Sequence, residues 1–255
     1  MSTQQKTSST VTKAFAILDL LVSKNESGLS LSEVSNHLHF SKSTSHRYLT
    51  TLEELGVVIR DDRDHFCLGP KLIELTGAYL SNHDLRNESE PYLEKLSSQT
   101  LETVHLAIPS GNDVIYIAKI DSTHSVRMAS HIGARNPMYC TSLGKVILAH
   151  YPADRVEEIV RDGLPARTPY TITSPDALQT ELELVRAQGF AIDEQENEEG
   201  VRCAGAPIFD YTRKVIGAIS VSGPASRLTR KRSIEIGSLA SDAAVEISGR
   251  MGYQP

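Results

Sequence analysis

Three short apolar stripes with helical spacing occupy the start of the chain, and a hairpin pattern follows them directly. Apolar residues recur every three or four positions in each stripe, as on one face of an α-helix. Ser30 and Ser41 precede the second and third stripes and suit N-caps, and Gly56 closes the third. The stripes lie at 11–22, 31–38 and 48–55, and two strand runs lie at 57–60 and 65–68 around a charged DDRD turn. Three helices and a hairpin in this order predict a winged helix-turn-helix unit.

The remainder of the chain alternates helical and strand patterns. We expect helices at 71–81, near 85–96, and at 141–149, 176–188 and 236–247, and strands at 104–108, 114–120, 126–130, 190–193, 201–209 and 215–222. Several connections between strands are too short for crossovers, so the sheet should be mostly antiparallel. The sequence therefore predicts an α+β protein with a winged helix-turn-helix domain at 1–70, a linker helix at 71–81 and a second domain at 82–255.

The chain has a formal net charge of −6, yet the window 34–52 contains no carboxylate. This window includes SKSTSHR, the start of the third predicted helix. In a helix-turn-helix, the hydroxyl, backbone N–H and cationic groups at this place contact bases and phosphates. We therefore expect DNA contacts from Lys42, Ser43, Thr44, His46 and Arg47. The alternative is a well-capped surface helix that binds no nucleic acid.

Neither a metal nor a cofactor is expected. The three cysteines lie far apart without a CxxC pair, and His37 and His39 lack a third ligand at suitable spacing, so these histidines should be solvated turn residues. No apolar stretch is long enough for a bilayer span, and the polar start lacks the apolar core of a signal peptide. We expect a cytoplasmic protein without membrane contacts.

A helix start in the second domain offers a seat for an anion. Free N–H groups at Ser142, Leu143 and Gly144 would hold a carboxylate, whereas ordinary helix capping is the alternative. Lys145 is the nearest cation, and its side chain should point away from this seat.

Three strand segments supply further polar candidates. Asp193 ends an apolar strand and is placed to project into the domain, whereas most of the acidic run 193–199 should be a solvated loop. Cys203 should be a structural or pocket-wall thiol, because no recognisable nucleophile signature surrounds it. Ser220 and Ser222 share one face of a strand, which suits a polar ligand unless that face meets solvent.

The assembled pattern resembles the IclR family of bacterial transcription regulators over nearly the whole chain. The matching segments are SKSTSHRYLTTLEELGVV, CLGPKLIELTGA and GARNPMYCTSLGKVILA, together with a signature at Gly189, Asp193, Glu196, Cys203, Gly205, Ile208, Phe209 and Asp210. Within the family, RMASHIGARNPMYC, TITSPDAL and EEGVRCAGAPIFD are similar to regulators of 2-keto-3-deoxygluconate catabolism.

The resemblance implies a GAF-like effector domain after the linker helix, and assembly as a homodimer or a dimer of dimers on an approximately palindromic operator. It also implies a repressor that is released by a small carboxylate, a keto sugar acid. The same resemblance implies a bacterial protein that is associated with the nucleoid when it is bound to DNA. The family's effector pocket falls on Met128, Ser142, Leu143, Asp193, Val201, Cys203, Ser220 and Ser222. Of these, Met128 and Val201 rest on the resemblance alone.

Four alternatives stay open at this point. The regulator could respond to a different small carboxylic acid, or it could act as an activator. An enzyme could use Cys203 or Asp193 on the same acid, although no acid/base pair or metal set accompanies them. Finally, the helix-turn-helix could bind protein rather than DNA.

Overall fold

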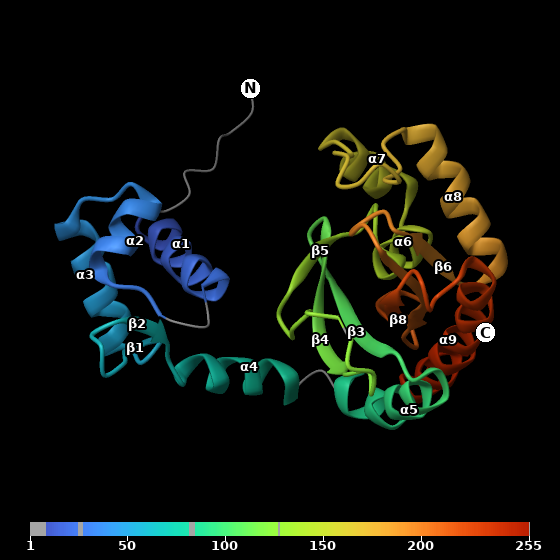
Figure 1. Ribbon diagram of the computed structural model, residues 1–255, viewed down its shortest axis with the longest axis horizontal. Helices are drawn as coiled ribbons and strands as arrows, with labels where there is room; N and C mark the ends of the chain where they lie inside the picture. Colours follow the sequence, from blue (N-terminus) through green and yellow to red (C-terminus); the bar gives the residue numbers. More distant parts are fainter. Residues whose placement is uncertain (1–8, 25–27, 82–84, 127, 255) are drawn as a thin grey trace. The chain divides into compact units, whose positions relative to one another are not determined.

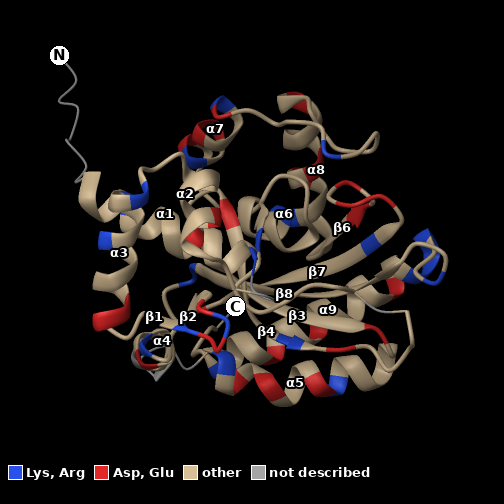
Figure 2. Ribbon diagram, turned by 60° about the vertical axis from the view of Figure 1, so that its left-hand side comes forward, with Lys and Arg blue, Asp and Glu red and all other residues tan. Residues whose placement is uncertain are grey.

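The computed structural model describes residues 9–24, 28–81, 85–126 and 128–254, and the chain divides into two compact units, 1–83 and 84–255. Figure 1 labels the elements of both units except β7, which is labelled in Figure 2. Each unit has its own core and is described by itself below.

The first unit is a winged helix-turn-helix, as the sequence predicts. Its elements are α1 (Ser9–Ser23), α2 (Leu31–Leu38), α3 (Lys42–Glu54), β1 (Val58–Arg60), β2 (Phe66–Leu68) and α4 (Lys71–Ser81). Ser30 caps α2 in a capping box with Glu33, which confirms the predicted helix start. Strands β1 and β2 pair antiparallel, and Ile17, Leu49 and Phe66 are packed in one core between the helices and this hairpin.

The second unit is an antiparallel sheet with helices on both faces, which confirms the α+β class. Its elements are α5 (Leu85–Thr100), β3 (Thr103–Ser110), β4 (Asp113–Ile120), β5 (Arg135–Pro137), α6 (Ser142–Leu148), α7 (Ala153–Arg161), α8 (Pro175–Gln188), β6 (Ala191–Glu194), β7 (Val201–Phe209), β8 (Val215–Pro224) and α9 (Arg230–Arg250). The strand order is β5-β4-β3-β8-β7-β6 (Figure 1).

Two apolar clusters lie on opposite faces of this sheet. Helices α5 and α9 pack on one face, where Leu106 and Ile219 lie, whereas α6, α7 and α8 cover the other, where Ala107 and Ala218 lie. Because successive strand residues point to opposite faces, His105, Ser220 and the residues aligned with them face α6. The polar side chains of this part of the sheet therefore lie beneath α6.

The strand predicted at 126–130 is wrong. Residue 127 lies outside the described residues, and the neighbouring positions are irregular. The carbonyl oxygens of Met128 and Ser130 accept hydrogen bonds from Lys119 Nζ at 3.1 and 2.6 Å. The Lys119 side chain thus binds backbone carbonyls that a neighbouring strand would otherwise pair with. The edge strand is instead β5, and the structure adds α7, which the sequence reasoning did not predict.

Candidate functional site

The start of α3 presents the side chains that were predicted to contact DNA. Ser41 caps the helix, and its Oγ accepts a hydrogen bond from Thr44 N at 3.2 Å. Tyr48, Leu49 and Leu52 are buried on the opposite side of the helix. The exposed residues among the predicted DNA contacts are Lys42, Ser43, His46 and Arg47, whereas Thr44 is half-buried. No acidic residue lies in the first turn, and the acidic colour on α3 is confined to its other end (Figure 2).

A cavity of about 240 Å³ lies on the α6 side of the sheet in the second unit. Its wall includes all eight residues that the family resemblance implies for the effector: Met128, Ser142, Leu143, Asp193, Val201, Cys203, Ser220 and Ser222. These residues come from β6, β7, β8, the start of α6 and the segment before β5. The fold thus brings together positions that are as far apart in the chain as Met128 and Ser222.

Strand register explains why the floor of the cavity is polar. Asp193 on β6 pairs with Cys203 on β7, and Cys203 pairs with Ser222 on β8. In the next row, Ser220 pairs with His105 on β3. Directly paired residues share a face of the sheet, so all five side chains point toward the same side.

Two glycines allow the close packing around the start of α6. A Cβ on Gly144 would lie 2.1 Å from the Cα of Met138, and a Cβ on Gly205 would lie 2.8 Å from the Ile219 carbonyl oxygen and 3.1 Å from Ser142 Oγ. Gly144 thus lets the helix pass close to the backbone of the segment before it. Gly205 leaves room for Ser142, at the helix start, to lie directly over β7.

The cap of α6 corrects one expectation about the anion seat. Thr141 is the N-cap, and its Oγ1 accepts a hydrogen bond from Gly144 N at 3.1 Å, so that N–H is not available. The seat is thereby reduced to the N–H groups of Ser142 and Leu143. Both residues line the cavity and are only 2% exposed.

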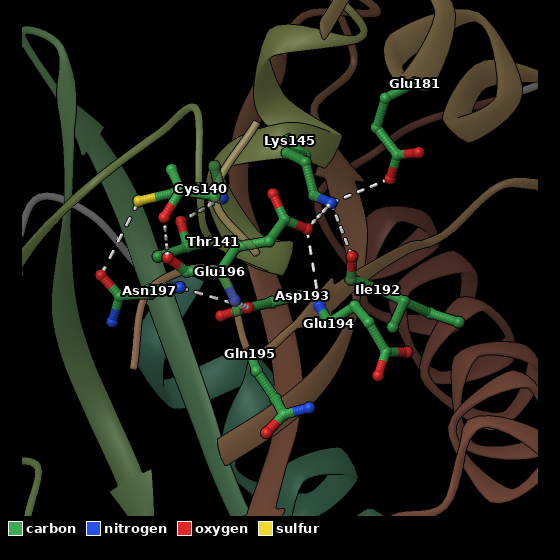
Figure 3. Close-up of polar contacts among 12 residues, drawn as sticks. Cys140, Thr141, Lys145, Glu181, Ile192, Asp193, Glu194, Gln195, Glu196 and Asn197 are labelled. Carbon is green, nitrogen blue, oxygen red and sulfur yellow. Dashed lines mark hydrogen bonds and ion pairs between the residues drawn. The ribbon is translucent and has the colours of Figure 1, made fainter. Parts of the chain in front are cut away.

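A buried ion cluster lies behind the cavity and corrects the expectation of a solvated acidic loop at Glu196, whereas Glu198 and Glu199 are exposed (Figure 3). Glu196 is 3% exposed, and one of its oxygens lies 2.5 Å from the ammonium of the fully buried Lys145. The same ammonium lies 2.8 Å from Glu181 and donates to the Ile192 carbonyl at 2.6 Å. Lys145 is not among the residues that line the cavity. Its ammonium therefore anchors the acidic loop through Glu196 and does not face the space for a ligand.

Burial and neighbouring charges change the protonation of this cluster. Burial opposes the charge on Lys145, but Glu196 and Glu181 outweigh it and raise the pKa of the ammonium above its ordinary value. Burial and the charge of Glu196 raise the pKa of Asp193 to about 7, although Lys145 and two backbone N–H bonds favour its ionised form. Asp193 Oδ1 accepts those bonds from Glu196 and Asn197. Near neutral pH Asp193 is therefore partly protonated and can donate as well as accept.

The cysteines of the second unit are poor nucleophiles. Burial, followed by the charge of Asp193, raises the pKa of Cys203 well above its ordinary value, and the same two causes raise the pKa of Cys140 to about 12. The thiolate is the reactive form, so neither thiol is activated. This fits the interpretation of Cys203 as part of the cavity wall.

Sequence reasoning missed His105 as a cavity residue. Its side chain lines the cavity together with Tyr116, Ser130 and Asn197, none of which was singled out. His105 is 1% exposed, and its ring stacks on Tyr116 with centroids 4.5 Å apart. One isolated histidine in an apolar strand carries no local signal of partners elsewhere in the chain. Knowledge of the strand register would have found it opposite Ser220.

Among the described residues, no group of three or more His, Cys, Asp or Glu side chains is arranged to hold a metal ion. No helix built from them is long and apolar enough to cross a membrane.

Comparisons with known proteins place both units in one family. Residues 10–62 match the IclR helix-turn-helix domain, and residues 77–249 match the bacterial transcriptional regulator IclR C-terminal domain. The chain is 40% identical over 248 residues to the HTH-type transcriptional regulator KdgR of Escherichia coli, covering 96% of this chain and 93% of that protein. It is 34% identical to the HTH-type transcriptional repressor AllR of Klebsiella pneumoniae, covering 98% and 93%.

A solved structure agrees with these relatives. The crystal structure of Thermotoga maritima IclR is similar with a TM-score of 0.77 and 37% identity, covering 96% of this chain and 99% of that one. With two family domains that together span most of the chain, and with relatives of this identity, the protein belongs to the IclR family of transcriptional regulators.

Proposed function

We propose that this IclR-family regulator is a repressor of sugar-acid catabolic genes. It binds an approximately palindromic operator through α3 of two or more subunits, as a homodimer or a dimer of dimers. A small carboxylate, a keto sugar acid of the 2-keto-3-deoxygluconate type, fills the cavity and releases the DNA. Helix α4, within the predicted linker 71–81, provides the covalent route between the two binding events.

The observation that carries this proposal is that the eight residues predicted for the effector line one cavity, six of them singled out from the sequence and two, Met128 and Val201, from the family resemblance alone. They offer N–H groups at Ser142 and Leu143 for a carboxylate, and Asp193, Ser220 and Ser222 for hydroxyl and keto groups. A polyhydroxylated keto acid can use both sets at once, whereas an aromatic or purely apolar acid leaves the second set unpaired. Its relatives KdgR and AllR, which are named as a regulator and a repressor, support the same class of function.

The test combines DNA binding with effector binding. A duplex selected by the wild-type protein from a random pool serves as the operator, and 2-keto-3-deoxygluconate serves as the effector. We expect the acid to weaken DNA binding and the DNA to weaken acid binding by the same factor, typically about 5 to 150-fold, because linkage is reciprocal. Turnover of the acid, or the absence of any coupling, would contradict the proposal.

Variants of the cavity test whether the effector binds there. Asp193→Ala should bind the operator normally but no longer release it when the acid is added, and the double variant Ser220→Ala, Ser222→Ala should behave in the same way. Normal release in both variants would show that the effector binds elsewhere. Release by a different small acid would retain the regulator and change its effector, and stronger DNA binding with the acid would point to an activator.

A further inference from the structure

His105 joins the floor of the cavity to its wall. Its ring Nε2 lies 2.6 Å from Ser130 Oγ, and its Nδ1 lies 3.4 Å from Ser222 Oγ. Ser222 belongs to the sheet, whereas Ser130 belongs to the irregular segment that also carries Met128. All four residues line the cavity. One side chain therefore fixes two hydroxyl groups that a ligand would meet from different directions.

The imidazole carries no charge in this position. Burial, aided by the nearby ammonium of Lys119, lowers the pKa of His105 to about 3, against a smaller opposing effect of Asp121. A neutral imidazole has one N–H donor and one lone pair. Of the two serines that it contacts, one accepts a hydrogen bond from the ring and the other donates one to it. The serine that donates to the ring can only accept a hydrogen bond from a ligand, whereas the other serine keeps its O–H to donate, whichever ring nitrogen holds the proton.

The surroundings hold this arrangement in place. The ring stacks on Tyr116 at an interplanar angle of 27°, which restricts its rotation. Lys119 Nζ binds the carbonyls of Met128 and Ser130, and it also pairs with Asp121 at 2.8 Å. Ser130 is therefore tethered from β3 through its hydroxyl and from β4 through its carbonyl. Pre-organised polar groups of this kind discriminate between ligands because they stay unpaired when the ligand lacks a matching group.

We propose that His105 is a specificity-determining residue, which orients the Ser130 and Ser222 hydroxyls so that the cavity favours hydroxylated keto acids over keto acids without hydroxyl groups. This inference rests on the proposed function, since it assumes that the cavity binds the effector. It assigns His105 a positioning role: the ring acts through the two serines and supplies no charge to the carboxylate.

The test compares two acids in matched variants. His105→Phe keeps the ring and its stacking on Tyr116 but removes both hydrogen bonds, whereas His105→Gln keeps one donor and one acceptor. His150→Phe makes the same exchange outside the cavity, where His150 contacts the edge of Phe209. Calorimetric titration gives the Kd for 2-keto-3-deoxygluconate, competition with pyruvate gives the second Kd, and thermal unfolding checks the fold of each variant.

We expect His105→Phe to lose about tenfold in affinity for 2-keto-3-deoxygluconate and little for pyruvate, as for one lost neutral hydrogen bond. His105→Gln should recover part of this selectivity, and His150→Phe should match the wild type. If the ratio of the two Kd values in His105→Phe equals that of the wild type, this inference is overturned and the proposed function stands. A wild-type protein that binds neither acid would overturn both.

Discussion

The two candidate sites of this protein are built in opposite ways. The DNA-binding candidates lie within six consecutive positions, 42–47, on the exposed side of one helix. The cavity draws on residues from His105 to Ser222, and its buried polar side chains, which are at most 5% exposed, are His105, Thr141, Ser142, Asp193, Ser220 and Ser222. A site on one helix depends on local capping, whereas a site assembled from a sheet depends on the whole domain. Substitutions in the first site should therefore act locally, whereas substitutions in the buried cluster that supports the second site should change the stability of the whole domain.

The largest effect is expected at Lys145. Lys145→Met removes the buried cation that pairs with Glu196 and Glu181 and leaves Glu196 without its counter-ion. An uncompensated buried charge costs about 3 to 5 kcal/mol. Hydrogen exchange should show lost protection in 84–255 and normal protection in 9–81. The surface pair partner Arg232, changed to Met, provides the control and should cost about 1 kcal/mol or less. Equal stability of the two variants would show that the cluster does not hold the domain together.

Arg47 and Thr44 test the other half of the comparison. Arg47→Ala and Thr44→Ala each remove a predicted DNA contact worth about 1 to 3 kcal/mol, and a symmetric dimer loses it twice. We expect much weaker binding to the selected duplex at fixed salt, with unchanged unfolding and unchanged acid binding. Arg161→Ala, at the exposed end of α7, is the control. Wild-type DNA affinity in both test variants would remove α3 from the DNA interface.

The same contrast explains what could be predicted from sequence. The capping serines, the hairpin and the helix stripes are local patterns, and the helices and strands that they predict are present, apart from the strand at 126–130. The buried state of Glu196 was missed because this residue lies in the loop after β6 whereas its partner Lys145 lies on α6, far away in the chain, and an acidic run alone looks solvated. His105 was missed for the same reason. Helix α7 was missed although Val156, Ile159 and Val160 lie at helical spacing and pack on the core, because no capping side chain marks its start.

Asp193 makes the second unit sensitive to pH. Its pKa in the folded protein is about 7, above the ordinary value of 3.8, so ionisation destabilises the fold. The folded state binds more protons between these two values, and stability therefore falls as the pH rises through them. Between pH 5 and pH 8 the wild type should lose about 2 kcal/mol relative to Asp193→Asn, which cannot ionise. Denaturant titrations at both pH values measure this. Parallel pH profiles of the two proteins would contradict the raised pKa.

The smallest effects separate folding from DNA recognition within the first unit. Ser30→Ala and Ser41→Ala each remove one N-cap, of α2 and of α3, and each should cost about 1 kcal/mol of stability. Only Ser41 also contacts side chains at the start of α3, with its Oγ 3.0 Å from Ser43 Oγ and 2.8 Å from Thr44 Oγ1. Its loss frees both hydroxyls from their positions, so Ser41→Ala should weaken binding to the selected duplex by more than Ser30→Ala does. Urea unfolding and DNA titration of the pair measure the two quantities separately. Equal DNA affinity at equal stability would mean that the serine cap supports the helix and does not order the residues predicted to contact DNA.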